Sequence, residues 1–310
     1  MTKQFYRNSY IGVLAIVATL YLPATHCSAR AKTLSPTTTD NHNSKEAVIY
    51  AWAASMATDK RGHYPIALLR LALEKSGKPY EATPSKHNMP QWRTLRHVQL
   101  NKELDVVWTF TDREREKNLL PIRIPIDRGL LGWRLLLINQ SDTQFFDQIH
   151  SVEQLKNLRS GQGHDWPDYP VLLANHFKVS PSSSYQGLFE MLQRHRIIYF
   201  PRSITEIDEE IQQHSDKSFS VAPKWVLNYP APLYFFVSKS KPELAAAIEK
   251  GLLKAIQDGS MRKLFHQHFG EIINKAKLAQ RQIIKLSNPN LPDETPLDQA
   301  HLWFSVQAGF

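Results

Sequence analysis

The sequence predicts an α/β protein with largely parallel sheets. Short apolar runs, such as residues 47–52 and 233–238, alternate along the chain with segments whose apolar residues recur at helical spacing. Alternation of this kind favours parallel pairing, because parallel strands need a long crossover connection. The 310 residues, 42% of them hydrophobic and 22% charged, can bury a large core without a disulfide or metal. This composition excludes disordered and collagen-like proteins.

An N-terminal segment, residues 1–31, has the three parts of a secretory signal peptide. Lys3 belongs to its basic start, and residues 11–22 form an apolar run that is too short to span a membrane as a helix. Small residues then offer cleavage after Ala29 or after Ala31. We therefore expect export to the periplasm, with an uncleaved membrane anchor as the alternative.

Cys27, the only cysteine, lies inside this segment. His26 and Ala24 occupy the positions where a lipoprotein signal has a small and an aliphatic residue, so lipidation is not favoured. After cleavage at Ala31 the mature chain has no cysteine, which suits an oxidising compartment without the use of disulfides. Residues 32–45 read as a polar linker.

The charge balance argues against a nucleic-acid-binding protein. The 38 basic and 29 acidic residues give a net charge of +9, and removal of Lys3, Arg7 and Arg30 with the signal leaves +6. The chain contains no run of lysines or arginines. No other apolar run approaches 18 residues, so we expect a soluble mature protein.

The mature chain begins with a strand at 47–52 and a helix at 65–76, which has proline in its first turn and Gly77 as its end signal. Further strand-like runs lie at 104–109, 122–126, 130–139, 196–200 and 233–238. Residues 185–192 have the spacing of a helix face. Three capping boxes predict helix starts at Ser151 with Gln154, Ser203 with Glu206, and Ser240 with Glu243.

Four stretches of the chain together resemble one known family. They are residues 47–69, 105–115, 188–196 and 234–270. The last is the most specific, since it contains Ser238-Lys239, Leu244, Asp258-Gly259 and Phe269-Gly270 in the family's order. Over residues 46–270 the chain resembles the family 3 extracytoplasmic solute-binding proteins of ABC importers, which have the type II periplasmic binding fold.

The resemblance implies two lobes joined by two crossing strands, with a ligand cleft between them. Lobe 1 would comprise residues 46–137 and 238–310, including a C-terminal extension after Asn288, and lobe 2 residues 138–237. Binding of a small polar solute would close the hinge. We expect a monomer that serves a membrane permease, or alternatively a separate sensor protein.

The resemblance also implies a carboxylate-binding arginine just after the aspartate-containing strand. Arg113 and Arg115 are the candidates, with Thr109 on the strand, because a planar guanidinium donates two parallel hydrogen bonds to a carboxylate. The spacing departs from the family, in which the arginine follows the threonine by three residues rather than four. A solvated charged turn over 112–117 is the alternative.

Arg202 and Ser203 occupy the place where amino-acid binders of the family usually have the aspartate that holds the ligand's ammonium group. An arginine there would repel an ammonium group, and the helix expected to start at Ser203 would favour an anion. The sequence therefore predicts an acidic or neutral polar solute rather than an ordinary α-amino acid. The alternative is that Arg202 points to solvent.

Two further loops supply candidate ligand contacts. Residues 161–168 contain two glycines that would let backbone N–H groups approach a ligand, together with Asp165 and Trp166. Trp166 would close over the ligand as an apolar lid, or belong to the core instead. In the loop after the first strand the candidates are Asp59, Arg61 and Tyr64.

No motif indicates a metal, a cofactor or an enzyme. His266 and His268 lie two apart on an expected helix, so their rings point to different faces, and the sequence has no zinc, P-loop, dinucleotide or nucleophile-elbow motif. We therefore predict a binding protein without catalytic residues. A lyase on the same fold is the alternative, with Glu114 or Asp165 as its acid or base.

Overall fold

A computed structural model describes residues 45–52 and 62–306 of the chain. The predicted signal peptide, Cys27 and most of the linker lie outside the described residues, as do the candidate ligand contacts Asp59 and Arg61. No described helix is both long enough and apolar enough to span a membrane.

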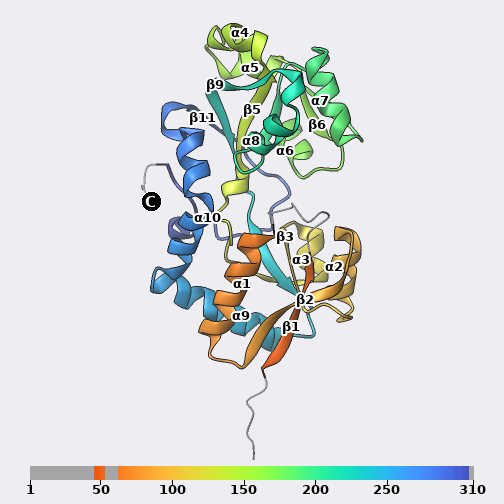
Figure 1. Ribbon diagram of the computed structural model, residues 1–310, viewed down its shortest axis with the longest axis vertical. Coiled ribbons are helices and arrows are strands. Elements are labelled where there is room, and N and C mark those ends of the chain that lie inside the picture. The colour runs from red at the N-terminus through yellow and green to blue at the C-terminus, as the bar shows by residue number, and fades with distance from the viewer. Residues whose placement is uncertain (1–44, 53–61, 307–310) are drawn as a thin grey trace, which may run out of the picture. The chain divides into compact units, whose positions relative to one another are not determined.

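The first sheet is mixed and has the strand order β2-β1-β3-β10-β4, and Figure 1 labels its strands β1, β2 and β3. β1 pairs in parallel with β2 and β3, whereas β10 is antiparallel to β3 and β4. Its strands are β1 (Glu46–Trp52), β2 (Tyr80–Asn88), β3 (Val106–Phe110), β4 (Leu120–Ile122) and β10 (Leu233–Val237).

The second sheet has the order β11-β9-β5-β8, and a separate parallel pair is formed by β6 and β7. β5 is antiparallel to both β8 and β9, while β11 is parallel to β9. The bounds are β5 (Trp133–Asn139), β6 (Ser160–Gly163), β7 (Val179–Ser182), β8 (Phe200–Ser203), β9 (Phe219–Asn228) and β11 (Gln282–Lys285).

The α/β class is confirmed, but the expectation of largely parallel sheets is wrong, because both main sheets are mixed. The cause lies in the two connections between the sheets. The chain enters the second sheet along β5 and leaves it along β9, so these neighbouring strands run in opposite directions. The antiparallel entry of β10 into the first sheet follows from the same return.

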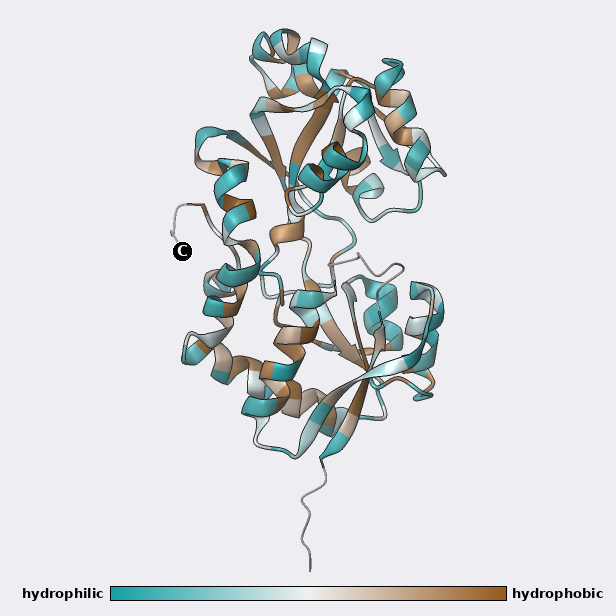
Figure 2. Ribbon diagram, viewed as in Figure 1, coloured by the Kyte–Doolittle hydropathy of each residue, from teal (hydrophilic) through white to brown (hydrophobic). Residues whose placement is uncertain are grey.

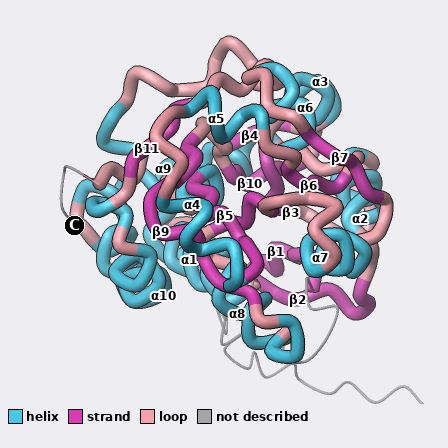
Figure 3. Tube along the Cα trace, turned by 90° about the horizontal axis from the view of Figure 1, so that it is seen from above, coloured by secondary structure: helices cyan, strands magenta, loops and turns pink. Residues whose placement is uncertain are grey.

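Helices α1, α9 and α10 pack together beside the first sheet, and Figure 3 shows helices placed around the strands. Figure 2 shows the hydrophobic residues gathered on the strands and on the helix sides next to them. The α-helices are α1 (His63–Ser76), α2 (Gln91–Gln99), α3 (Arg113–Asn118), α4 (Thr143–Asp147), α5 (Val152–Asn157), α6 (Asp168–Ala174), α7 (Tyr185–Gln193), α8 (Ile207–Gln213), α9 (Pro242–Gln257) and α10 (Ser260–Ala276). Single 3₁₀ turns are η1 (Leu130–Gly132), η2 (Gln140–Asp142), η3 (Ser215–Lys217), η4 (Leu278–Gln280) and η5 (Ala300–Leu302).

Two of the predicted helix boundaries are confirmed and two are wrong. Gly77 ends α1 in the left-handed conformation, with φ of 77°, as predicted. The capping box at Ser151 and Gln154 is confirmed, with both reciprocal hydrogen bonds present. The box at Ser203 is wrong, because α8 begins only at Ile207. The box at Ser240 is also wrong, since α9 begins at Pro242, whose fixed φ suits the first helical position.

Two expected strands are displaced. The apolar run at 196–200 contributes only Phe200 to β8, which extends to Ser203, and Tyr199 makes a single bridge to Ser160. The run at 122–126 overlaps β4 only at Ile122. In both places most of the apolar side chains are buried, so the hydrophobic pattern indicated core residues but not which residues pair in a sheet.

The two sheets are joined by two linkers, residues 123–132 and 229–232. The linkers touch at Gly132, whose backbone oxygen accepts a hydrogen bond from the N–H of Tyr229 at 3.2 Å. The segment after α10 also reaches the second sheet, since β11 pairs with β9. Part of the region expected to complete lobe 1 therefore lies in the second sheet.

Candidate functional site

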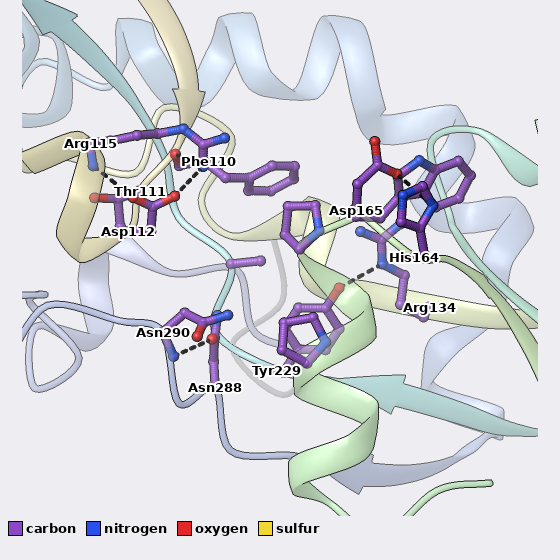
Figure 4. Close-up of a pocket in the computed structure, with 14 residues that line it drawn as sticks. Phe110, Thr111, Asp112, Arg115, Arg134, His164, Asp165, Tyr229, Asn288 and Asn290 are labelled. Carbon is purple, nitrogen blue, oxygen red and sulfur yellow. Dashed lines mark hydrogen bonds and ion pairs between the residues drawn. The ribbon is translucent and has the colours of Figure 1, made fainter. Parts of the chain in front are cut away.

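A cavity of about 280 Å³ is lined by loops of both sheets and by the 229–232 linker (Figure 4). From the first sheet come residues at the end of β3 and in α3, including Phe110, Asp112 and Arg115. From the second sheet come Arg134 on β5 and the 164–167 loop after β6. Segments from distant parts of the sequence therefore meet around one space.

Arg115 is the predicted arginine that reaches the cavity. Asp112 caps α3 by accepting a hydrogen bond from the N–H of Arg115 at 2.7 Å. Nη1 of Arg115 donates a hydrogen bond to the carboxylate of the same aspartate at 2.6 Å and another to the backbone oxygen of Phe110 at 3.1 Å. Arg115 is thus held in place through its backbone N–H and Nη1, while Nε and Nη2 have no hydrogen-bond partner among the described residues.

Arg134 lines the cavity above a buried polar network. The side chain of Arg134 is almost fully buried, and its Nε lies 2.8 Å from Asp168 and 3.1 Å from the hydroxyl of Tyr229. Its Nη1 lies 3.5 Å from Glu206. Burial is the largest single influence and would lower the pKa of Arg134, but Asp168, Glu206 and Tyr229 together outweigh it and raise the pKa. Arg134 therefore stays charged.

Tyr229 belongs to the same network. Its hydroxyl pairs with Asp168 as well as with Arg134. Burial raises the pKa of Tyr229 well above its ordinary value, so the hydroxyl keeps its proton and donates a hydrogen bond to the Asp168 carboxylate. The hydrogen bonds and ion pairs of this network hold Arg134 and Tyr229 in place in the cavity lining.

Arg202 does not reach the cavity wall, so its predicted contact with a ligand is not supported. Its Nε donates to both carboxylate oxygens of Glu210 at 2.8 and 2.9 Å, and its Nη2 lies 3.1 Å from Glu206. The guanidinium is buried against the ring of Trp166, at 4.9 Å. The argument that Arg202 repels an ammonium group therefore fails, because two carboxylates neutralise it. The solvent-facing alternative is wrong as well.

Trp166 lies both at the cavity and against the core. It lines the cavity, and its ring also stacks on Phe200 with centroids 6.1 Å apart. Gly163 lies beneath the ring, where an added Cβ would come within 2.4 Å of it. Asp165 lines the cavity beside His164, whose Nδ1 is 3.8 Å from the Asp165 carboxylate.

Four other candidates lie away from the cavity lining. Arg113 is on the exposed side of α3, where it binds the backbone oxygen of Pro289 at 2.8 Å and Asp293 at 3.2 Å. Thr109 is buried and accepts a hydrogen bond from Gln91 at 3.1 Å. Tyr64 is buried on α1, and Ser203, buried on β8, forms a local turn with Thr205 instead of capping a helix.

The sequence reasoning missed Asp112, Arg134, Tyr229, Asn288 and Asn290. One signal was present: Arg134 is a lone charge within the apolar run 130–138, and such a charge needs a buried partner. The two asparagines lie beyond the region that resembles the family, so no pattern pointed to them. Among the described residues, no group of three His, Cys, Asp or Glu side chains could hold a metal ion.

No family model matches the sequence, and no curated protein matches it. Among solved structures, the chain is similar to a probable amino-acid ABC transporter extracellular-binding protein from Bacillus subtilis, at 18% identity and a TM-score of 0.57. The match covers 73% of this chain and 98% of that one.

An ancestral arginine-binding protein is also similar, both in its arginine-bound form, at 18% identity, and in its glutamine-bound form, at 19%. Each has a TM-score of 0.50, and the matches cover 73% and 72% of this chain and 99% and 98% of the other. These structural neighbours are amino-acid binding proteins, and at such identity they show the fold. The predicted type II periplasmic binding fold is confirmed.

Proposed function

We propose that this protein is a periplasmic solute-binding protein that captures a small polar solute and presents it to an ABC importer. The observation that carries the proposal is the cavity wall itself, which combines segments of both sheets with one of the linkers between them. A solute in this cavity would touch both halves of the fold at once. It would therefore favour a closed arrangement over an open one, and differential affinity of this kind is all that the function requires.

The two sheets would be the cores of two lobes. We place residues 46–137 and the return from 238 in lobe 1, and residues 138–237 in lobe 2, with one amendment. Because β11 pairs with β9, residues 282–285 would move with lobe 2. The chain would then cross between the lobes twice more than the family pattern requires, on the way to β11 and back.

We infer that the solute is a zwitterionic amino acid. The wall contains two carboxylates, Asp112 and Asp165, as well as two guanidinium groups, Arg115 and Arg134, so it carries charged side chains of both signs. Such a wall suits a molecule that carries both a carboxylate and an ammonium group. The free part of the Arg115 fork would bind the carboxylate. With Arg202 neutralised by Glu210, nothing in the described wall singles out an anion.

A thermal-shift screen of residues 32–310 against amino acids, small organic acids and sugars tests the proposal. A compound present at 100 times its dissociation constant stabilises the native state by about 2.7 kcal/mol. We expect hits among amino acids, lost in Arg115→Ala and retained in Lys117→Ala, which removes an exposed cation from the same helix. Hits confined to acids without an amine would restore the anionic alternative. The absence of any hit would overturn the importer proposal.

A further inference from the structure

We propose that the C-terminal segment 286–304 forms one wall of the solute site and that Asn290 is a specificity-determining contact, with Asn288 as the residue that positions it. The proposal rests on the solute-binding function above. Both asparagines line the cavity, and Figure 4 shows them together on one side of it, apart from His164 and Asp165. The segment lies beyond residues 46–270, which carry the family resemblance.

The segment is fixed where it passes the cavity. Asn175, at the end of α6, donates to the backbone oxygen of Ser287 at 2.8 Å and accepts from its N–H at 3.1 Å. Arg113 on α3 holds the backbone oxygen of Pro289. The chain around residue 290 is thus tied to elements of both sheets, so a side chain there has a defined position relative to the cavity.

The end of the segment is docked on the other linker. Arg128 donates to the backbone oxygen of Trp303 at 3.0 Å, and the N–H of Phe304 donates to the backbone oxygen of Arg128 at 2.7 Å. Gly129 leaves room for the Trp303 ring, since an added Cβ would lie 2.6 Å from it. These contacts hold the far end of the wall as the bonds at Ser287 and Pro289 hold its near end.

The two asparagines differ in how their side chains are used. Asn288 uses both ends of its amide group: its Oδ1 accepts from the N–H of Asn290 at 3.1 Å, and its Nδ2 donates to the backbone oxygen of Pro230 at 2.8 Å. The side-chain amide of Asn290 makes no hydrogen bond with the described residues. A carboxamide has two donors and an acceptor. Asn290 can therefore donate and accept hydrogen bonds, and its partner would be the polar group of the solute that does not bind Arg115.

The test uses residues 32–310 and the twenty standard amino acids as probes, with dissociation constants measured by calorimetry for each probe that binds the wild type. Asn290→Ala should weaken binding about 5- to 10-fold, as expected for the loss of one or two hydrogen bonds, while the melting temperature of the unliganded protein stays unchanged. Asn290→Asp should change the rank order, favouring basic over acidic amino acids. Asn274→Ala, at an exposed position on α10, is the matched control and should bind like the wild type.

The positioning role of Asn288 has its own readout. Asn288→Ala should weaken binding of all probes by a similar factor, and this loss should disappear when Asn290 is already alanine, as a double-mutant cycle reveals. Equal losses in both backgrounds would overturn the positioning role. If Asn290→Ala changes the dissociation constants by less than 2-fold, this inference is wrong while the amino-acid proposal stands. If the wild type binds none of the probes, the amino-acid proposal falls and this inference with it.

Discussion

At the scale of single residues, Arg134 is a buried charge that organises the polar side chains beside the cavity. It is the one charged residue of β5, a strand whose seven residues are all buried. A buried guanidinium is tolerated only when carboxylates and hydrogen bonds replace its hydration, and Asp168, Glu206 and Tyr229 do so here. The partners lie on α6, before α8 and in a linker, so the network ties β5 to three separate segments.

Replacing Arg134 should therefore destabilise the protein strongly. Arg134→Met leaves Asp168 buried without its cation, and we expect the free energy of unfolding in urea to fall by roughly 3–5 kcal/mol. The double variant Arg134→Met with Asp168→Asn should recover part of this loss, because the unpaired charge is gone. A loss below about 1 kcal/mol in the single variant would show that the pair is solvated.

Asp127 is a second buried charge, located in the linker before η1. Its carboxylate accepts hydrogen bonds from the N–H groups of Gly129 and Leu131 at 3.1 and 3.0 Å, but burial dominates and raises its pKa from 3.8 to about 6. The native state therefore binds this proton more tightly than the unfolded chain. The corresponding stability is complete below pH 4 and is lost as the pH rises to about 6.

The pH dependence of unfolding should reveal this group. Two units of pKa correspond to about 3 kcal/mol, so the wild type should lose about that much more stability between pH 4 and pH 7 than Asp127→Asn does. Urea unfolding across this range measures the difference. Identical pH profiles for the two proteins would mean that Asp127 titrates normally in the fold.

At the scale of elements, close packing between α1 and α9 depends on one small residue. A Cβ placed on Gly251 of α9 would lie 1.8 Å from the backbone oxygen of Ala72 on α1. The helices touch through their backbones, and α9 in turn contacts β4 and β10. Glycine is disfavoured within a helix, so its presence there is explained by packing.

Gly251→Ala should thus destabilise the protein even though alanine is the better helix former. The helices would have to separate, and overpacking of this kind costs typically 1–3 kcal/mol. Gly270, which is half-buried on α10, is the control, because apart from the helix backbone an added Cβ there would meet only Nδ1 of His266, at 3.9 Å. Gly270→Ala should be neutral or stabilising in the same thermal unfolding measurement, and equal effects of the two changes would contradict the packing argument.

At the scale of the whole molecule, the number of connections between the sheets governs how they can move. Besides the linkers 123–132 and 229–232, the chain passes from α10 to β11 and returns through the 286–304 segment to the turn at Gly129. The linkers themselves touch at Gly132, where an added Cβ would lie 2.0 Å from the backbone oxygen of Tyr229. Motion between the sheets must therefore be shared by all of these segments.

Solute binding should reduce the size of the molecule. We expect any compound that raises the melting temperature to lower the radius of gyration measured by small-angle X-ray scattering, because the solute contacts both halves. Arg115→Ala should show no such change at the same compound concentration. Stabilisation of the wild type without compaction would indicate that the solute binds without closing the hinge.

The sequence by itself determined the features that depend on neighbours along the chain. The end of α1 at Gly77, the capping box at Ser151 and the α/β alternation are local patterns, and the order of four short motifs was enough to predict the type II fold. Each rests on backbone geometry or periodicity within a few residues.

Only the tertiary structure decided which side chains meet. Arg113 and Arg115 are two residues apart, yet one binds Pro289, 176 positions away, and the other lines the cavity. The sequence predicted that Arg202 contacts a ligand, but in the structure Arg202 binds Glu210. Arg134 binds Tyr229, which lies 95 positions further along the chain. A charged side chain goes where its desolvation is compensated, and the compensating groups come from segments that only folding brings together.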